Sequence, residues 1–169
     1  MEKNQMDVKK ICCLYVSDWH LSVMLEAYIN KQINKDVGIT TILKKDVKKN
    51  MEKIVKILGK KKDEKIMSID YEKKEVISYD KIEKMIDSVI HNKELNIILD
   101  LDEQEQLKYD KYIEKYIEKK CLNNKTIKII NCFEISSIKN NSSKIIKKHH
   151  SLLNTSGEIS IEKFFDNVI

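Results

Sequence analysis

The chain has 169 residues, of which 41% are hydrophobic and 35% are charged, a balance typical of a folded globular protein. One hydrophobic core suffices at this length, so we expect a single domain over residues 1–169. The 32 basic residues are all lysine. Because arginine supplies the bidentate fork that recognises phosphate and guanine, the net charge of +5 does not indicate direct nucleic-acid binding.

Targeting signals are not evident in the sequence. No apolar run approaches the roughly 20 residues needed to span a bilayer, and the first ten residues, MEKNQMDVKK, lack the apolar centre of a signal peptide. We therefore expect a cytoplasmic protein that does not associate with membranes. Its four cysteines should be reduced there, and none forms a CxxC pair.

Short apolar runs typical of strands alternate with longer stretches that have helical periodicity. Strands are expected at residues 11–16, 39–43, 66–69, 96–101 and 127–133, with a further extended piece at 75–79. Helices are expected between them, with N-caps at Ser17 or Asp18, at Asp46 and at Asp80, where Glu83 completes a capping box. Gly59 is expected to cap the C-terminus of the second helix. Two further helices are expected at about 103–120 and 142–153. The tail from residue 158 should dock through Phe164 and Phe165.

This alternation predicts an α/β fold, a three-layer sandwich with a mostly parallel five-stranded sheet covered on both faces. Ligands of such sheets bind at the carboxyl ends of the strands. Residues that directly follow the expected strands are therefore the ones to consider, and they include Lys44–Asp46, Tyr71 and Asp100–Glu105. The candidate ligand-binding residues are Ser17, Asp18, Trp19, His20, Asp70, Asp102 and Glu134.

The loop after the first expected strand, residues 17–20, lies where a nucleotide-binding relative would carry a glycine-rich phosphate cradle. Here it has no glycine and no lysine, and Asp18 would repel a phosphate. We therefore expect no ATP binding in the usual mode; any other cofactor is left open. Trp19 and His20 could form the rim of a site for an aromatic or apolar ligand, or simply begin the helix with an exposed His and a packed Trp.

The segment IILDLDEQE places Asp100, Asp102 and Glu103 after an apolar strand, as in a Walker B strand end with its acidic magnesium ligand. Carboxylates grouped in this way could hold a divalent cation for a metal-dependent hydrolase or phosphotransferase. Acidic residues also favour a helix N-terminus because of the helix dipole. Without a phosphate cradle opposite them, the second interpretation is favoured.

Histidines and cysteines supply the remaining candidates. His149 and His150 are adjacent on an expected helix and point in different directions, which does not suit a shared metal. Cys12, Cys13 and Cys132 lie in two expected strands, where a free cysteine usually behaves as a small core hydrophobe. They are nevertheless kept as redox or metal candidates, since only Cys12 or Cys13 can share a face with Cys132.

The chain resembles the MEDS family (methanogen/methylotroph, DcmR sensory). The resemblance lies in ICCLYVSDWHLSVMLEAYINKQI near the start, in YDKYIEKYI, and in IKIINCFEI followed by a helix ending in HH and a tail with FF. It implies a RecA- and KaiC-like fold that has lost its ATP motifs, with a RecA-like strand order in which the final strand lies beside the first. In a flavodoxin-like order, by contrast, other strands would separate them.

Members of that family sense small molecules within regulators that are often fused to kinases or DNA-binding domains. We expect no attached output domain, and therefore a non-catalytic small-molecule or redox sensor that acts through a regulatory protein partner, with a homodimer also open. The alternatives are the metal-dependent enzyme and a pure interaction scaffold.

Overall fold

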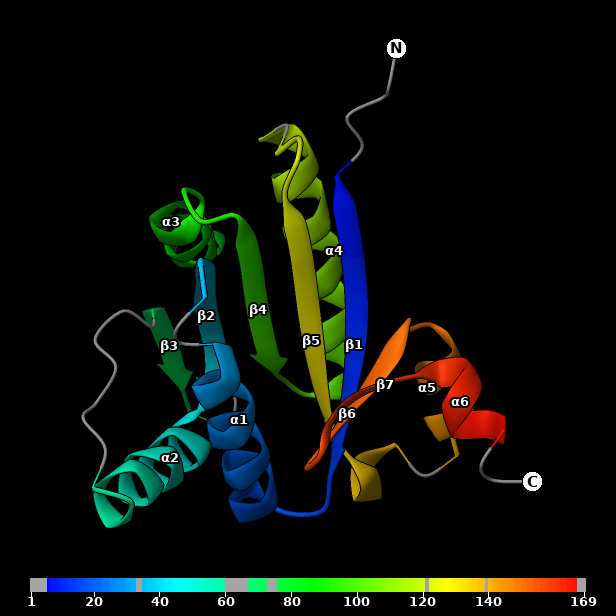
Figure 1. The fold of residues 1–169 in the computed structure, drawn as a ribbon. Helices are drawn as coiled ribbons and strands as arrows, with labels where there is room; N and C mark the ends of the chain where they lie inside the picture. The colour runs from blue at the N-terminus through cyan, green and yellow to red at the C-terminus, as the bar shows by residue number, and fades with distance from the viewer. Residues whose placement is uncertain are drawn as a thin grey trace.

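The computed structural model describes residues 6–32, 35–59, 67–72, 76–120, 122–138 and 140–166. Strands and helices alternate along most of the chain (Figure 1). The strands are β1 (Asp7–Tyr15), β2 (Val37–Lys44), β3 (Met67–Tyr71), β4 (Glu94–Asp100), β5 (Thr126–Glu134), β6 (Ser151–Asn154) and β7 (Gly157–Ser160). The helices are α1 (Asp18–Gln32), α2 (Lys45–Ile57), α3 (Tyr79–Val89), α4 (Glu103–Lys119), the 3₁₀ turn η1 (Ile135–Ser137), α5 (Ser142–Lys147) and α6 (Ile161–Asp166).

The fold is α/β, with a mixed sheet that is parallel except for β7. Its order is β3-β2-β4-β5-β1-β6-β7, so the expectation of five strands is wrong. β1 pairs with β5, but β5 is not the final strand, and β6 covers the other side of β1. The observed order therefore differs from the five-stranded order in which the last strand lies beside the first.

Helices cover the sheet on both faces and make three layers (Figure 1). One face of β1, β2, β4 and β5 forms a buried cluster with α1 and α2. The other face packs against α3 and α4, and a smaller cluster beneath α5 and α6 continues it beside β1. Phe164 and Phe165 pack on that smaller cluster, as expected for a docked tail.

Helix ends follow local chemistry. Gly59 has φ +65°, the left-handed conformation expected of a C-terminal cap. The cap at the start of α3 was predicted wrongly, because Ser78 and not Asp80 is the N-cap, and its Oγ accepts a hydrogen bond from the Lys81 amide at 3.3 Å. The extended piece expected at 75–79 lies partly outside the described residues, and Tyr79 already belongs to α3.

The helix expected at 142–153 ends at Lys147, and residues 151–154 form β6 instead. The reason is tertiary: β1 offers an unpaired edge, and a strand there buries Leu152 and Leu153 while satisfying backbone groups. His150 holds the connection from α5 to β6 against β1, since its amide donates to the Lys10 carbonyl and its Nδ1 accepts from the Lys10 amide. Within the described ranges, none of the helices has the length and apolarity to cross a membrane.

Candidate functional site

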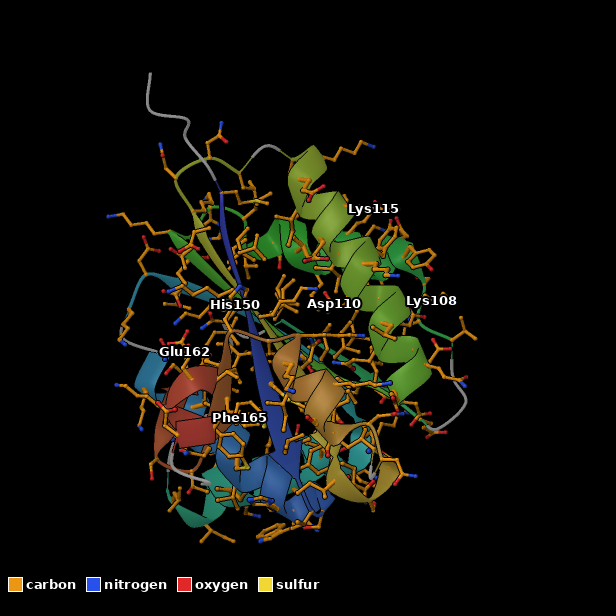
Figure 2. All side chains as sticks on the ribbon, turned by 90° about the vertical axis from the view of Figure 1, so that its right-hand side faces the viewer. Lys108, Asp110, Lys115, His150, Glu162 and Phe165 are labelled. Atoms are coloured by element: carbon orange, nitrogen blue, oxygen red, sulfur yellow. The ribbon has the colours of Figure 1, made fainter. Side chains whose placement is uncertain are left out.

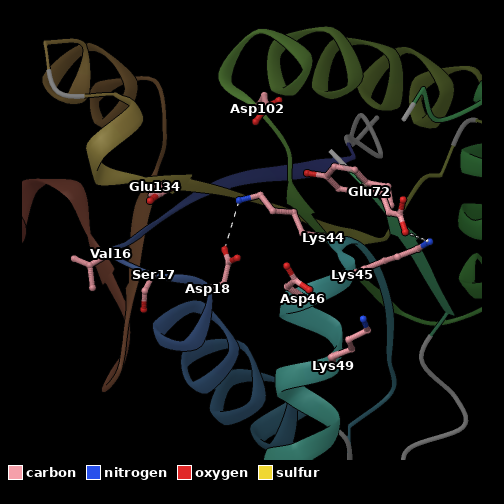
Figure 3. A pocket seen from close by; sticks show the side chains of 11 residues that line it. Val16, Ser17, Asp18, Lys44, Lys45, Asp46, Lys49, Glu72, Asp102 and Glu134 are labelled. Carbon is pink, nitrogen blue, oxygen red and sulfur yellow. Dashed lines mark hydrogen bonds and ion pairs between the residues drawn. The ribbon is translucent and has the colours of Figure 1, made fainter. Parts of the chain in front are cut away.

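A pocket of about 650 Å³ opens where the carboxyl ends of the parallel strands meet (Figure 3). Its walls come from the ends of β2, β3 and β5 and from the first residues of α1 and α2. This is the edge at which parallel α/β sheets bind ligands. The described lining residues are Val16, Ser17, Asp18, Lys44, Lys45, Asp46, Lys49, Tyr71, Glu72, Asp102 and Glu134.

Lys44 ends β2, and its side chain extends across the pocket floor toward Asp18 (Figure 3). Its Nζ donates to the Tyr15 hydroxyl at 2.9 Å and lies 3.6 Å from Asp18 Oδ1 and 3.8 Å from Asp100 Oδ1. Tyr15 in turn donates to Asp100 Oδ1 at 2.8 Å. A hydrogen-bonded path therefore runs from a lysine on the pocket wall through a tyrosine to a buried carboxylate.

Asp100 is the buried end of this path. The residue has no solvent exposure, and its Oδ2 has no hydrogen-bond partner among the described residues. Burial raises the pKa of Asp100 to about 6, against the opposing effects of the Lys44 charge and the Tyr15 hydrogen bond. At neutral pH the carboxylate is therefore charged, with Lys44 as its nearest cation.

Two tyrosines hold the backbone and side chain of Asp100. Tyr71, at the end of β3, donates a short hydrogen bond to the Asp100 carbonyl. Burial, and then the Asp100 charge, raises the pKa values of Tyr15 and Tyr71 well above the usual range for tyrosine. Both phenols therefore stay protonated and act as hydrogen-bond donors, not as bases.

The rest of the lining carries both charges. Lys45 forms an ion pair with Glu72 at 2.9 Å, visible beside the pocket in Figure 3. Lys49 projects from the next turn of α2. On the opposite side of the pocket, Asp102 follows the end of β4, and Glu134 is the last residue of β5 (Figure 3). A polar ligand would thus meet lysines at the amino end of α2 and carboxylates at two neighbouring strand ends.

The structure brings four of the seven candidate ligand residues to this pocket: Ser17, Asp18, Asp102 and Glu134. The other three are not among its described lining residues. Trp19 is 48% exposed, and His20 accepts the Val16 amide hydrogen at Nδ1 and faces a separate apolar cavity. Asp70 accepts a hydrogen bond from the Ser68 hydroxyl at 2.7 Å.

Sequence reasoning gave too little weight to the lysines. Lys44 and Lys45 were visible as residues that follow a strand, but Lys49 was not singled out. The available signal was its spacing: it lies four residues after Lys45, one helical turn along the same face. The path from Tyr15 to Asp100 could not be found, because it depends on how β1, β2 and β4 are placed in space.

The three carboxylates that the sequence offered as a less favoured divalent-cation site, Asp100, Asp102 and Glu103, diverge. Asp100 is buried beneath Lys44, Asp102 lines the pocket, and Glu103 faces a different cavity between α4 and α5. In the described part of the chain, no group of three or more His, Cys, Asp or Glu side chains could hold a metal ion.

The three cysteines in the strands are free and fully buried. Cys13 and Cys132 are directly paired positions of β1 and β5 and belong to the same core cluster, whereas Cys12 belongs to the cluster on the other face. Burial raises the pKa of Cys12 to about 12 and raises that of Cys132 well above its usual range. Because all three thiols are fully buried, they pack as small apolar groups.

Comparisons with known proteins identify no family: no family model, no curated protein and no solved structure matches the chain.

Proposed function

We propose that the chain is a non-catalytic regulatory domain that binds a small polar ligand in the pocket at the strand ends and acts through a partner protein. The observation that carries this proposal is the pocket itself, a 650 Å³ space with a floor of Lys44 tied to Tyr15 and Asp100. That volume suits a small organic molecule. The resemblance to MEDS domains and to a degenerate RecA-like core agrees with this role.

The chemistry of the lining supports binding without catalysis. The described lining residues include no cysteine or histidine. Tyr15 and Tyr71 hold their protons, and the ammonium of Lys44 is occupied by Tyr15. Such groups recognise and orient a ligand, but they supply no nucleophile with an adjacent base. The metal-dependent alternative lacks convergent ligands, as described above.

Communication with a partner is proposed for three exposed apolar residues in the loop before α1 and in its first turns. Val16, Trp19 and Val23 are 64%, 48% and 41% exposed, although all three are apolar. Val16 also lines the pocket, so ligand contact and the exposed apolar surface meet at one residue. A ligand that reorients the loop after β1 would change this surface.

Native mass spectrometry of freshly purified protein tests the proposal by looking for a bound small molecule. Ser17→Trp fills the pocket from an exposed lining position and should remove the adduct. Lys49→Gln should weaken it, whereas Lys53→Gln should not, because Lys53 is an exposed α2 lysine that is not among the described lining residues.

An adduct that survives Ser17→Trp would contradict the proposed site. If the protein purifies without a ligand, a thermal-shift screen of polar metabolites at millimolar concentration replaces the adduct as the readout. Absence of any stabilisation in that screen would favour the interaction scaffold over a ligand-binding domain.

A further inference from the structure

A second cavity, of about 230 Å³, lies between α4, β5 and α5, on the sheet face opposite α1 and α2. It shares no described lining residue with the pocket at the strand ends. Its wall contains a chain of polar side chains, Gln106, Asp110, Asn131 and His149. Gln106 and Asn131 are 1% exposed in an otherwise apolar interior, so their hydrogen bonds must be well satisfied.

The hydrogen bonds fix the tautomer of His149. Its Nδ1 lies 2.6 Å from the Ile145 carbonyl oxygen, which can only accept, so Nδ1 carries the hydrogen. Its Nε2 lies 3.1 Å from Asn131 Nδ2, which can only donate. The imidazole is therefore neutral, with its Nε2 lone pair toward Asn131.

From Asn131 the row of hydrogen-bonded side chains continues toward Gln106. Asn131 Nδ2 also donates to Asp110 Oδ2 at 3.1 Å, and Asn131 Oδ1 accepts from Gln106 Nε2 at 2.7 Å. Gln106 Nε2 donates its second hydrogen to the Leu99 carbonyl, and Gln106 Oε1 accepts from the Leu101 amide, both at 3.1 Å. The row of hydrogen bonds thus ends on the backbone on either side of Asp100, at the turn from β4 into α4.

Charged groups surround the imidazole from each packed element. Asp110, on the side of α4 that faces the sheet (Figure 2), forms an ion pair with Lys10 of β1 at 3.2 Å. The cavity is also lined by Glu103 of α4 and by Lys144 and Lys148 of the α5 segment, and His150 follows in sequence. Burial lowers the pKa of His149, and the Asp110 charge acts in the opposite direction.

We propose that His149 is a proton sensor: a proton is taken up at its Nε2 and stays there, and the resulting change in hydrogen bonding is transmitted through Asn131 and Gln106 to the β4–α4 turn of the strand-end pocket. The proton comes from solvent, and no other group changes its protonation. Imidazole becomes imidazolium, and Nε2 changes from a hydrogen-bond acceptor to a donor.

Two donors then face each other, so the Asn131 amide rotates to present Oδ1 to His149. This rotation turns Asn131 Nδ2 away from Asp110 Oδ2, which keeps Lys10 Nζ as its donor at 3.2 Å. It also turns Nδ2 toward Gln106 Nε2, so the Gln106 amide must rotate in turn. Gln106 then presents a donor to the Leu101 amide and an acceptor to the Leu99 carbonyl, so the turn loses both bonds. The adjoining cavity, lined by all three side chains, gives the amides room to rotate.

Asp102 is the residue through which the pocket would register this change. It is the N-cap of α4 and lines the strand-end pocket, one residue after Leu101. Loss of the Gln106 bonds frees the backbone that positions its carboxylate. This inference goes beyond ligand binding, and its test needs no ligand, so its failure would leave the proposed pocket unaffected.

Heteronuclear NMR between pH 7.5 and 4.5 tests the relay. In the wild-type protein, the neutral His149 ring should show hydrogen on Nδ1. The Leu101 amide should titrate with the His149 midpoint, and its exchange, corrected for the intrinsic pH dependence, should accelerate at least about tenfold below it. Because Asp100 titrates nearby, the comparison is repeated in the Asp100→Asn background.

His149→Gln should abolish the response of Leu101, whereas His91→Gln, a change of an exposed histidine that follows α3, should leave it intact. A neutral ring with hydrogen on Nε2 would overturn the proposal, as would a Leu101 response that persists unchanged in His149→Gln. Should His149→Gln fail to fold, the ring tautomer and the two midpoints in the wild-type protein still decide the matter.

Discussion

The Tyr15 hydroxyl donates a 2.8 Å hydrogen bond to Asp100 Oδ1, and both residues are almost completely shielded from solvent. The pair joins the carboxyl ends of two strands that are not neighbours in the sheet, since β5 lies between β1 and β4. The Tyr15 hydroxyl also accepts a hydrogen bond from the Lys44 ammonium. Pocket chemistry and fold stability therefore depend on the same two side chains.

The first prediction concerns pH. Because the pKa of Asp100 is raised from 3.8 to about 6 in the fold, the folded state binds its proton more tightly than the unfolded state does. The stabilisation is fully present below pH 3.8 and is lost as pH rises through about 6. At 1.36 kcal/mol per pKa unit, the loss is about 3 kcal/mol.

Urea unfolding of the wild-type protein and of Asp100→Asn at a series of pH values measures this term. The variant has no proton to lose at this position, so the difference in unfolding free energy should fall by about 2.5 kcal/mol between pH 4 and pH 7. A difference that stays constant over this range would show that Asp100 titrates as it does in the unfolded chain.

Tyr15→Phe removes the donor to Asp100 Oδ1, and the other oxygen of this carboxylate, Oδ2, already has no hydrogen-bond partner among the described residues. Above pH 6 the buried carboxylate is then left with Lys44, and we expect a loss of about 1–3 kcal/mol in unfolding free energy. The loss should shrink at low pH, where Asp100 is neutral. Tyr109→Phe is the control, because Tyr109 donates to the Ile77 carbonyl and its loss should not vary with pH.

Cysteine reactivity should follow burial. In a Cys121→Ser background, the native protein should not react with a thiol reagent at pH 8, since Cys12, Cys13 and Cys132 are all fully buried. At sub-denaturing urea, a short bifunctional thiol-reactive cross-linker should join Cys13 to Cys132. Cys13→Ser should abolish this product and Cys12→Ser should not, because Cys12 faces the opposite side of the sheet. Linkage through Cys12 would contradict the strand register.

Two glycines allow a comparison of steric and conformational costs. A Cβ at Gly38 would lie 2.6 Å from Val89 Cβ and 3.0 Å from the Val89 carbonyl oxygen, so α3 would have to move. A Cβ at Gly59 meets nothing within 4 Å, but its φ is +65°. We expect Gly38→Ala to cost about 2–3 kcal/mol and Gly59→Ala about 1 kcal/mol in thermal or urea unfolding. Equal costs would mean that α3 adjusts freely.

Periodicity predicted the first five strands and most helices because these segments are long and regularly patterned. It failed at residues 151–154, where Leu152 and Leu153 continue a helical stripe from Ile145 and Ile146, and only the open edge of β1 favours a strand. The start of α3 was misplaced because Ser78 and Asp80 are both good caps. In both cases two local sequence patterns fit equally well, and packing against residues distant in the sequence decides between them.

The candidate site was predicted in part for a similar reason. The rule that ligands bind at strand ends found Asp18, Asp102 and Glu134, which do line the pocket. It could not separate Asp18 from Trp19, because successive helical residues project about 100° apart and only the placement of α1 decides which faces inward. Lys44 was visible, but its bonds to Tyr15 depend on long-range packing.

The central position of β1 has a consequence for how the chain is made. Asp7 pairs with Thr126, and Ile11 pairs with both Ile130 and Ser151. Both edges of β1 therefore stay unpaired until the ribosome has synthesised β5 and β6. At roughly 5–20 residues per second, that interval lasts on the order of ten seconds. Throughout it, the apolar segment of β1 is open to association with other nascent chains. The yield of native protein should therefore depend on synthesis rate and on whatever shields this segment during translation.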